Sequence, residues 1–146
     1  IKAKGGQEIY DRNYDVAVIA APGGDVTVYA LHPETLRNDA QLALRNSFFQ
    51  VLALSIDPRP NIVMMGDFNA TRWDPYFGKV RAAGHLHEQP WLFPPLTRLQ
   101  GNNPLVGVAL DHILAGPRGR LSDCHTGPAL GSDHVPMICS VAFATK

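Results

Sequence analysis

Hydrophobic residues alternate in a strand-like pattern near the start of the chain. Residues 15–21 and 25–32 each place an apolar side chain at every second position, which is typical of strands with one buried face. The Pro-Gly-Gly segment at 22–24 separates the two runs and favours a tight turn, so the pattern predicts a β-hairpin. His32 falls at the end of the second strand, and Pro33 then stops further strand pairing.

A helix and a buried strand are predicted next. Apolar residues recur at helical spacing over residues 42–56, and either Asn38 or Asp39 can cap the start of this helix. The prolines within residues 57–60 end it. Residues 61–66 include a continuous apolar run, which is typical of a strand buried on both faces. The order of these elements predicts a unit of strand, crossover helix and strand.

Shorter elements are predicted in the rest of the chain. Asp74 and Pro75 can supply the N-cap and the first position of a short helix, which Gly84 ends as a C′ residue. Residues 85–104 contain several prolines and are predicted to form a long loop. Three further strands are predicted at residues 106–115, 121–126 and 135–143.

The composition describes one folded domain without a general attraction for nucleic acid. The chain has 146 residues, of which 45% are hydrophobic and 18% charged, values typical of a globular protein. Lysine plus arginine equals aspartate plus glutamate at 13 each, so no basic field favours non-specific binding of DNA. This balance still permits an enzyme that acts on phosphate esters, because a metal ion can supply the positive charge. No apolar run is long enough to span a membrane, and no secretory signal opens the sequence.

The cysteines and several histidines leave alternatives open. Cys124 and Cys139 can form a disulfide if neighbouring strands bring them together, but we expect two buried free thiols. A zinc-site protein is a separate functional hypothesis, although the residues lack the ligand spacing of a closed zinc site. Its candidate ligands are His85, His87, Cys124 and His125.

Polar side chains follow the buried strand at 61–66. Asp67 and Asn69 come where this strand ends, and ligands in α/β proteins collect beyond the carboxyl ends of strands. The same two residue types also stabilise turns, so this segment alone leaves a site and a turn as alternatives.

Two other carboxylates lie in contexts that indicate chemistry. Asp111 interrupts an apolar strand, and a buried unpaired charge costs several kcal/mol, so Asp111 needs a partner or a function. Asp133 and His134 are adjacent and point to opposite sides of an extended chain, which leaves Asp133 free to face a cation. His134 can then accept Asp111 as its partner, because a carboxylate fixes the tautomer of an imidazole. Together with Asp67, these residue types are the ones that metal-assisted phosphoryl transfer uses.

Three aromatic side chains near these segments are assigned to other roles. His112 points away from Asp111 on its strand, and we expect it to be structural or to lie at the rim. Trp73 and Trp91 flank the same loops in sequence, and packing is the expected role of both.

Three short motifs together resemble one protein family. Residues 66–69 (Gly-Asp-Phe-Asn), 110–114 (Leu-Asp-His-Ile-Leu) and 131–134 (Gly-Ser-Asp-His) occur in this order. They resemble the motifs of the endonuclease/exonuclease/phosphatase family, which includes pancreatic deoxyribonuclease, apurinic endonucleases, neutral sphingomyelinases and inositol polyphosphate phosphatases. Independent short matches rarely co-occur by chance, so the three motifs in this order are specific. The resemblance covers residues 15–145. It implies a divalent-metal-dependent phosphoesterase that hydrolyses a phosphodiester or a phosphomonoester with activated water.

The resemblance implies roles at the phosphate for three residues. His32 would contact the scissile phosphate and stabilise charge in the transition state. Asp67 would orient or deprotonate the attacking water. Asn69 would form a hydrogen bond with the phosphate and help to place that water.

The resemblance also implies a divalent metal, Mg²⁺ or Mn²⁺, at a site that includes Asp133 and Asp67. His134 would act on the phosphate or the water, and Asp111 would orient His134. The substrate would be a phosphate ester, with nucleic acid, a phospholipid head group and an inositol phosphate as the alternatives.

The chain departs from the family in its length. The family fold is a four-layered α/β sandwich with mixed, largely antiparallel sheets and flanking helices, usually of roughly 250 residues. Its first half supplies an Asn and a metal-binding Glu, whereas Gln7 and Glu8 here follow no apolar strand. Residues 1–146 are therefore expected to form a single domain that is the C-terminal half of this sandwich and lacks the N-terminal half.

A half domain would expose a sheet face, which predicts a homodimer or another partner at that face. Because the metal-binding Glu is not identifiable, the alternative function is a catalytically incomplete remnant of the fold that acts as a binding module. The chain begins with Ile1, so we expect a processed or truncated piece and leave its localisation open.

Overall fold

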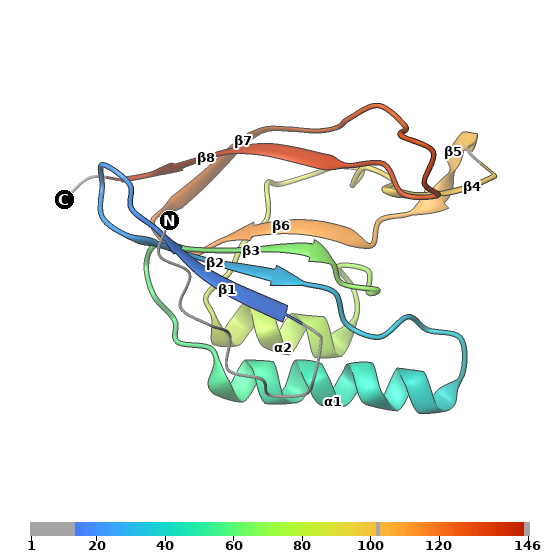
Figure 1. Ribbon diagram of the computed structural model, residues 1–146, viewed down its shortest axis with the longest axis horizontal. Helices are drawn as coiled ribbons and strands as arrows, with labels where there is room; N and C mark the ends of the chain where they lie inside the picture. Colours follow the sequence, from blue (N-terminus) through green and yellow to red (C-terminus); the bar gives the residue numbers. More distant parts are fainter. Residues whose placement is uncertain (1–13, 102, 145–146) are drawn as a thin grey trace.

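The computed structural model describes residues 14–101 and 103–144 and arranges them in layers. Helices α1 and α2 cover one face of a central sheet, and the ribbon of β7 and β8 lies over the other face (Figure 1). In chain order the elements are β1 (Tyr14–Ile19), β2 (Val26–Leu31), α1 (Asp39–Ser55), β3 (Ile62–Asp67), α2 (Pro75–Ala83), β4 (Arg98–Gln100), β5 (Asn103–Val108), β6 (Asp111–Ala115), β7 (Gly119–Thr126) and β8 (Met137–Phe143).

The central sheet confirms the predicted hairpin and crossover unit. Its strand order is β1-β2-β3-β6. β1 and β2 pair antiparallel around the turn at 22–24, while β2 and β3 pair parallel through α1. β3 then pairs antiparallel with β6, so the sheet is mixed as predicted. A parallel pair needs a crossover connection, and α1 provides it.

Local signals set the ends of both helices. Asn38 caps α1, since its side chain accepts the amide of Gln41. Asp74 caps α2 by accepting two amides of its first turn, and Pro75 occupies the first turn itself. No helix in the described parts of the chain has the length and apolar character needed to cross a membrane.

Gly84 ends α2, but as its C-cap and not as the predicted C′ residue, and the structure gives a packing reason for glycine at this position. Its φ is −86°, so the residue does not use the left-handed conformation, which falls instead to His85 at φ 49°. A Cβ on Gly84 would lie 2.8 Å from Cδ1 of Ile56. The glycine therefore lets the end of α2 approach the end of α1 closely.

The main core lies between the helices and the sheet. Phe68 and Phe77 meet there with ring centroids 4.8 Å apart. Each fully buried side chain of this size contributes about 1.5–3 kcal/mol. The members with almost no exposed surface are Phe49, Phe68, Phe77, Leu52, Ile62, Met64, Leu114 and Val80.

The other face of the central sheet is only partly covered. The β7–β8 ribbon contacts the sheet at β6, and Ile19 and Met65 on this face are each 40% exposed. The predicted burial of β3 on both faces therefore holds up to Met64 but not at Met65. Whether a second copy of the chain covers this face stays a prediction.

Residues 106–115 do not form the single strand that the sequence predicts. β5 ends at Val108 and β6 begins at Asp111, because the backbone between them bonds to other partners. Oγ1 of Thr97 accepts the amides of Leu110 and Asp111, and the carbonyl of Leu110 accepts the amide of Phe68. β5 pairs instead with β4, a short strand inside the predicted loop at 85–104.

Cys124 and Cys139 form a disulfide, so the expectation of free thiols is wrong. β7 and β8 pair antiparallel, and a register shift between Ser122 and His125 brings the two Cα atoms to 4.1 Å. The sequence could not reveal this register. Trp91 packs against the same cluster as predicted, whereas Trp73 is 73% exposed and the packing role expected for it is wrong.

Candidate active site

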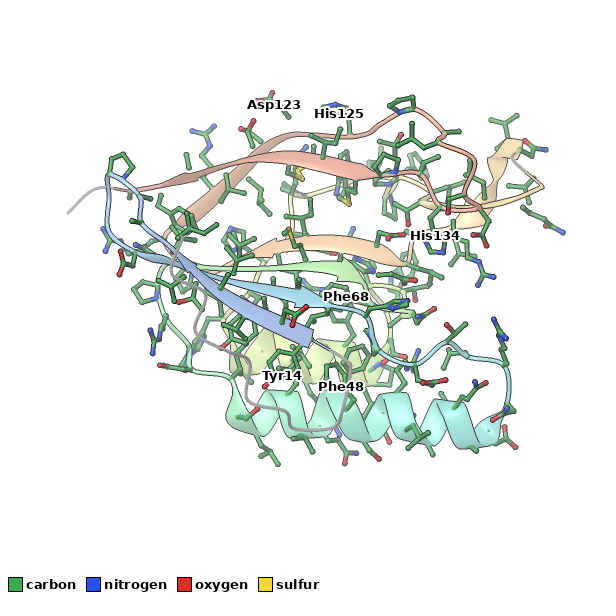
Figure 2. The ribbon with its side chains drawn as sticks, viewed as in Figure 1. Tyr14, Phe48, Phe68, Asp123, His125 and His134 are labelled. Carbon is green, nitrogen blue, oxygen red and sulfur yellow. A yellow bond between two sulfur atoms is a disulfide. The ribbon has the colours of Figure 1, made fainter. Side chains whose placement is uncertain are left out.

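Strand pairing brings Asp67 and Asp111 together. Asp67 ends β3, Asp111 begins β6, and the antiparallel register pairs them directly. His134 joins them from the loop before β8, at the edge of the sheet where β3 ends (Figure 2). Ligand atoms of Asp67, Asp111 and His134 all lie within 4.8 Å of one another. Two carboxylates and an imidazole from distant parts of the sequence therefore share one site.

His134 pairs with Asp111 as the sequence predicts. Nδ1 of His134 lies 2.8 Å from Oδ2 of Asp111. Because an ionised carboxylate only accepts hydrogen bonds, Nδ1 of His134 donates to Asp111 and the ring is held with Nε2 toward the site. Nε2 lies 3.8 Å from Oδ2 of Asp67. The ring thus presents Nε2 toward Asp67.

Asp67 uses its two carboxylate oxygens differently. Oδ1 accepts the amide of Asn69 at 2.8 Å, which forms a tight turn. Oδ2 faces the site and lies 3.9 Å from Nε2 of His32. Burial raises the pKa of Asp67 and nearby Asp111 adds to this, while the Asn69 hydrogen bond and the two imidazoles act in the opposite direction. A carboxylate with a raised pKa binds a proton more tightly than usual and suits a general base.

Asn69 is held in a constrained position beside Asp67. The residue is 4% exposed and has φ 46°, a left-handed conformation that Asn tolerates better than most residues. Its Nδ2 donates to the carbonyl of Pro33 at 2.9 Å. The segment therefore forms a turn and also carries Asp67 into the converging group. A contact between Asn69 and phosphate stays a prediction.

Asp133 lies beside the site but outside the converging group. Its side chain is 63% exposed, and Oδ2 lies 3.3 Å from Nε of Arg98. Within the described residues, the group that could hold a metal contains Asp67, Asp111 and His134. The role of Asp133 as a metal ligand stays a prediction.

A cavity of about 540 Å³ opens next to these residues. It lies between the segment after His32 and the β4–β5 hairpin. Both apolar and polar groups line it. Its lining includes Leu36, Asn69, Arg98, Val106, Val108 and Asp133. A site of this size and mixed polarity is large enough for a small organic group attached to a phosphate.

Sequence patterns did not identify several residues that support the site. Thr97 fixes the start of β6 through its two hydrogen bonds, and no sequence signal marks it. Arg45 is buried in α1 on the same face as Phe49 and Leu52. A charged residue inside an apolar stripe is a sequence signal from which the burial of Arg45 could have been predicted. His112 is 4% exposed and has a structural position, as predicted.

The alternative zinc set is contradicted by the disulfide. Cys124 is bonded to Cys139 and has no thiolate for a metal. Nδ1 of His125 lies 2.7 Å from the carbonyl of Asp123, and neither His85 nor His87 belongs to the candidate metal group found in the described residues.

The sequence profile of the Endonuclease/Exonuclease/phosphatase family matches residues 3–134. The chain therefore belongs to this family. No curated protein sequence matches the chain significantly.

Solved structures share the fold at low sequence identity. An endonuclease/exonuclease/phosphatase from Beutenbergia cavernae matches with a TM-score of 0.68 and 21% identity, over 89% of this chain and 39% of that one. The 3′ phosphatase NExo from Neisseria, bound to product DNA hairpin, matches with a TM-score of 0.64 and 18% identity, over 91% and 65% of the two chains. Beta toxin from Staphylococcus aureus with bound magnesium ions matches with a TM-score of 0.59 and 16% identity, over 92% and 58%.

These matches confirm the predicted α/β fold with a mixed sheet and flanking helices. The chain spans between 39% and 65% of the length of these three structures. Its assignment as a single domain that lacks an N-terminal half stays a prediction, and Gln7 and Glu8 lie outside the described residues.

The donor set fits the metals that this family commonly uses. Mg²⁺ and Mn²⁺ prefer oxygen ligands, and two carboxylates lie in the converging group. Mg²⁺ keeps several waters when only one or two carboxylates bind it, so a partial protein ligand set is chemically reasonable.

Proposed function

We propose that the chain carries the hydrolytic centre of a Mg²⁺- or Mn²⁺-dependent phosphoesterase, which cleaves a phosphodiester or a phosphomonoester with activated water. The observation that carries this proposal is the row formed by Asp111, His134 and Asp67. Asp111 orients the imidazole of His134, and the imidazole faces the free oxygen of Asp67. Family membership supports a phosphoesterase fold, and this row supplies groups that activate water within it.

Asp67 is the proposed base for the attacking water. The Asn69 amide binds Oδ1, while Oδ2 lies 3.9 Å from Nε2 of His32 and 3.8 Å from Nε2 of His134. Both separations exceed a direct hydrogen bond, so a water beside Oδ2 could also contact an imidazole.

The two histidines are proposed to stabilise the reacting phosphate. His134 is held by Asp111, so an imidazolium at this position keeps a fixed orientation while charge develops on the phosphate oxygens. The side chain of His32 is 73% exposed at the end of β2 and can approach a phosphate in front of Asp67. Asn69 would position the water or the phosphate from the adjoining turn.

Asp67 and Asp111, with Asp133 as the further predicted ligand, are the residues that would hold the divalent ion. When bound, such an ion supplies positive charge to phosphate oxygens. The chain has equal numbers of acidic and basic residues, so this charge is not supplied by a general basic field.

The substrate proposed is a phosphate ester with a compact organic group. The cavity beside Asn69 and Asp133 could receive that group. Nucleic acid, a phospholipid head group and an inositol phosphate remain the alternatives. NExo acts as a 3′ phosphatase and was solved with DNA, and this supports including nucleic acid among the substrates to be tested.

The experiment is hydrolysis of a chromogenic phosphodiester and of a chromogenic phosphomonoester, each with EDTA, Mg²⁺ or Mn²⁺. We expect metal-dependent turnover that disappears in Asp67→Asn and His134→Ala. Asp123→Asn is the matched control, because Asp123 lies on the outer layer away from His134 (Figure 2). Its activity should equal that of the unmodified chain.

A folded chain without turnover under any of these conditions would contradict the proposal and favour the second candidate, a catalytically incomplete remnant that acts as a binding module. The observation behind this candidate is that the chain spans only 39–65% of the structures it resembles. Residues that complete the site in those proteins could then lie in the part without a counterpart here.

A further inference from the structure

Two buried basic side chains hold consecutive carbonyl groups of the site loop, which we define as residues 67–74. Nη1 of Arg45 donates to the carbonyl of Asn69 at 2.7 Å. Nε2 of His112 lies 2.8 Å from the carbonyl of Ala70. Arg45 is 3% exposed and His112 is 4% exposed. Because a carbonyl oxygen only accepts hydrogen bonds, both side chains donate to the loop.

Each basic side chain also contacts a carboxylate on its other side. Nη2 of Arg45 lies 2.5 Å from Oδ2 of Asp74, the N-cap of α2. Nδ1 of His112 lies 2.6 Å from Oε1 of Glu88. The loop is therefore fixed to α1 and α2 through Arg45, and to β6 through His112.

The loop that they hold contains the proposed base. The amide of Asn69 binds Oδ1 of Asp67, and the Asn69 side chain binds the carbonyl of Pro33, the residue after His32. A shift of the Asn69 carbonyl would therefore move Asp67 and the segment of His32 together. Burying a cation costs several kcal/mol of desolvation, and Arg45 is buried where it contacts both the Asp74 carboxylate and the Asn69 carbonyl.

We propose that Arg45 is a positioning residue of the hydrolytic site, which acts by holding the Asn69 carbonyl so that Oδ2 of Asp67 keeps its orientation toward His134. This inference rests on the proposed function. Arg45 reaches no reacting atom, since its guanidinium is occupied by the Asn69 carbonyl, Asp74 and Asn46. It also lies over the ring of Phe49, with 5.7 Å between Cζ and the centroid, which fixes the guanidinium plane.

The test compares Arg45→Lys with Leu52→Ala. Lysine keeps the charge but cannot bridge the Asn69 carbonyl and Asp74 with a planar fork. Leu52 is 2% exposed on the same helix, about two turns from Arg45, so its truncation destabilises the packing of α1 but leaves the hydrogen bonds of Arg45 in place. Both variants are assayed well below their melting temperatures. We expect Arg45→Lys to lower kcat by about 10- to 100-fold with little change in KM, while Leu52→Ala keeps kcat near that of the unmodified chain.

A second measurement separates this inference from the proposed function. The amide of Asn69, observed by ¹H–¹⁵N NMR, reports its hydrogen bond to Asp67 whether or not the chain hydrolyses anything. We expect its chemical shift and its protection from hydrogen exchange to change in Arg45→Lys and not in Leu52→Ala.

If Arg45→Lys does not fold, Asp74→Asn replaces it, because Asn can keep the N-cap through its Oδ1, whereas its Nδ2 cannot accept the hydrogen bond that Nη2 of Arg45 donates to Oδ2 of Asp74. We expect a smaller change in the same two measurements. An unchanged Asn69 amide together with an unchanged kcat in the folded variant would overturn the inference. A chain without turnover but with the predicted NMR changes would contradict the proposed function and leave the positioning of the loop supported.

Discussion

Replacement of Glu88 by Gln should destabilise the fold through His112. Glu88 is 8% exposed at its side chain, its Oε1 lies 2.6 Å from Nδ1 of His112, and its Oε2 lies 3.3 Å from Arg72. Gln has nearly the same volume but lacks the negative charge. Removing one partner of a buried ion pair costs about 3–5 kcal/mol. Gln can still form a hydrogen bond, so we expect the lower end of this range, about 3 kcal/mol, and a fall in Tm of about 10 °C.

The lowered pKa of Glu88 determines how its contribution to the free energy of unfolding changes with pH. Burial raises the pKa of Glu88, but the hydrogen bond and charge of His112, with Arg72 and Arg81, outweigh it and lower the pKa below its usual value. The unfolded chain therefore binds a proton at Glu88 before the folded chain does as the pH falls. The stabilisation is complete above the ordinary pKa of glutamate, about 4.3. It is lost as the pH falls through the lowered value in the folded state.

Urea unfolding followed by circular dichroism measures this difference at pH 7, 5 and 3. The free energies of unfolding of the unmodified chain and of Glu88→Gln should differ fully at pH 7 and 5 and converge toward pH 3. Glu34→Gln is the matched control, since the side chain of Glu34 accepts a part-buried hydrogen bond from Gln41, and it should change stability by less than about 1 kcal/mol. Equal stability at pH 7, or a difference that persists unchanged to pH 3, would refute the reasoning.

Three further predictions concern the turn, the disulfide and the orienting carboxylate. Gly66→Ala should destabilise the fold by about 3 kcal/mol or more in chemical denaturation, because φ is +139° and a Cβ would lie 2.0 Å from the Leu31 carbonyl oxygen; an unchanged midpoint would contradict the backbone geometry. Replacing Cys124 and Cys139 together by Ser should cost about 3 kcal/mol, as expected for a crosslink with a sequence separation of 15, and no change upon reduction of the unmodified chain would argue against the bond. Asp111→Asn should reduce kcat by about 10- to 100-fold in the hydrolysis assay, since His134 loses the charged acceptor that fixes its orientation; full activity would contradict an orienting role for Asp111.

Elements with local signals could be predicted from the sequence. Asn38 and Asp74 cap the two helices because their side chains bond to amides only two or three residues away. The turn at 22–24 likewise needs no distant partner. The pairing of Asp111 with His134 could also be predicted, because a buried carboxylate in an apolar strand needs a partner.

Features that depend on distant contacts could not be predicted in this way. The break between β5 and β6 depends on Thr97, which lies 13 residues before Leu110, outside the strand that it interrupts. The disulfide depends on the register shift in β7. Asp133 faces Arg98 because β4 lies beside it, and that strand gave no sequence signal.

The most direct test of the account is a Mn²⁺ titration followed by electron paramagnetic resonance of the free ion. We expect saturable binding that weakens at least about tenfold in Asp67→Asn and in Asp111→Asn, and that is unchanged in Asp123→Asn. Asp133→Asn, measured beside them, decides whether this carboxylate joins the converging group or serves only to pair with Arg98. Binding that is equally strong in Asp67→Asn, or no binding by the folded chain, would contradict the claim that these side chains form a divalent-metal site.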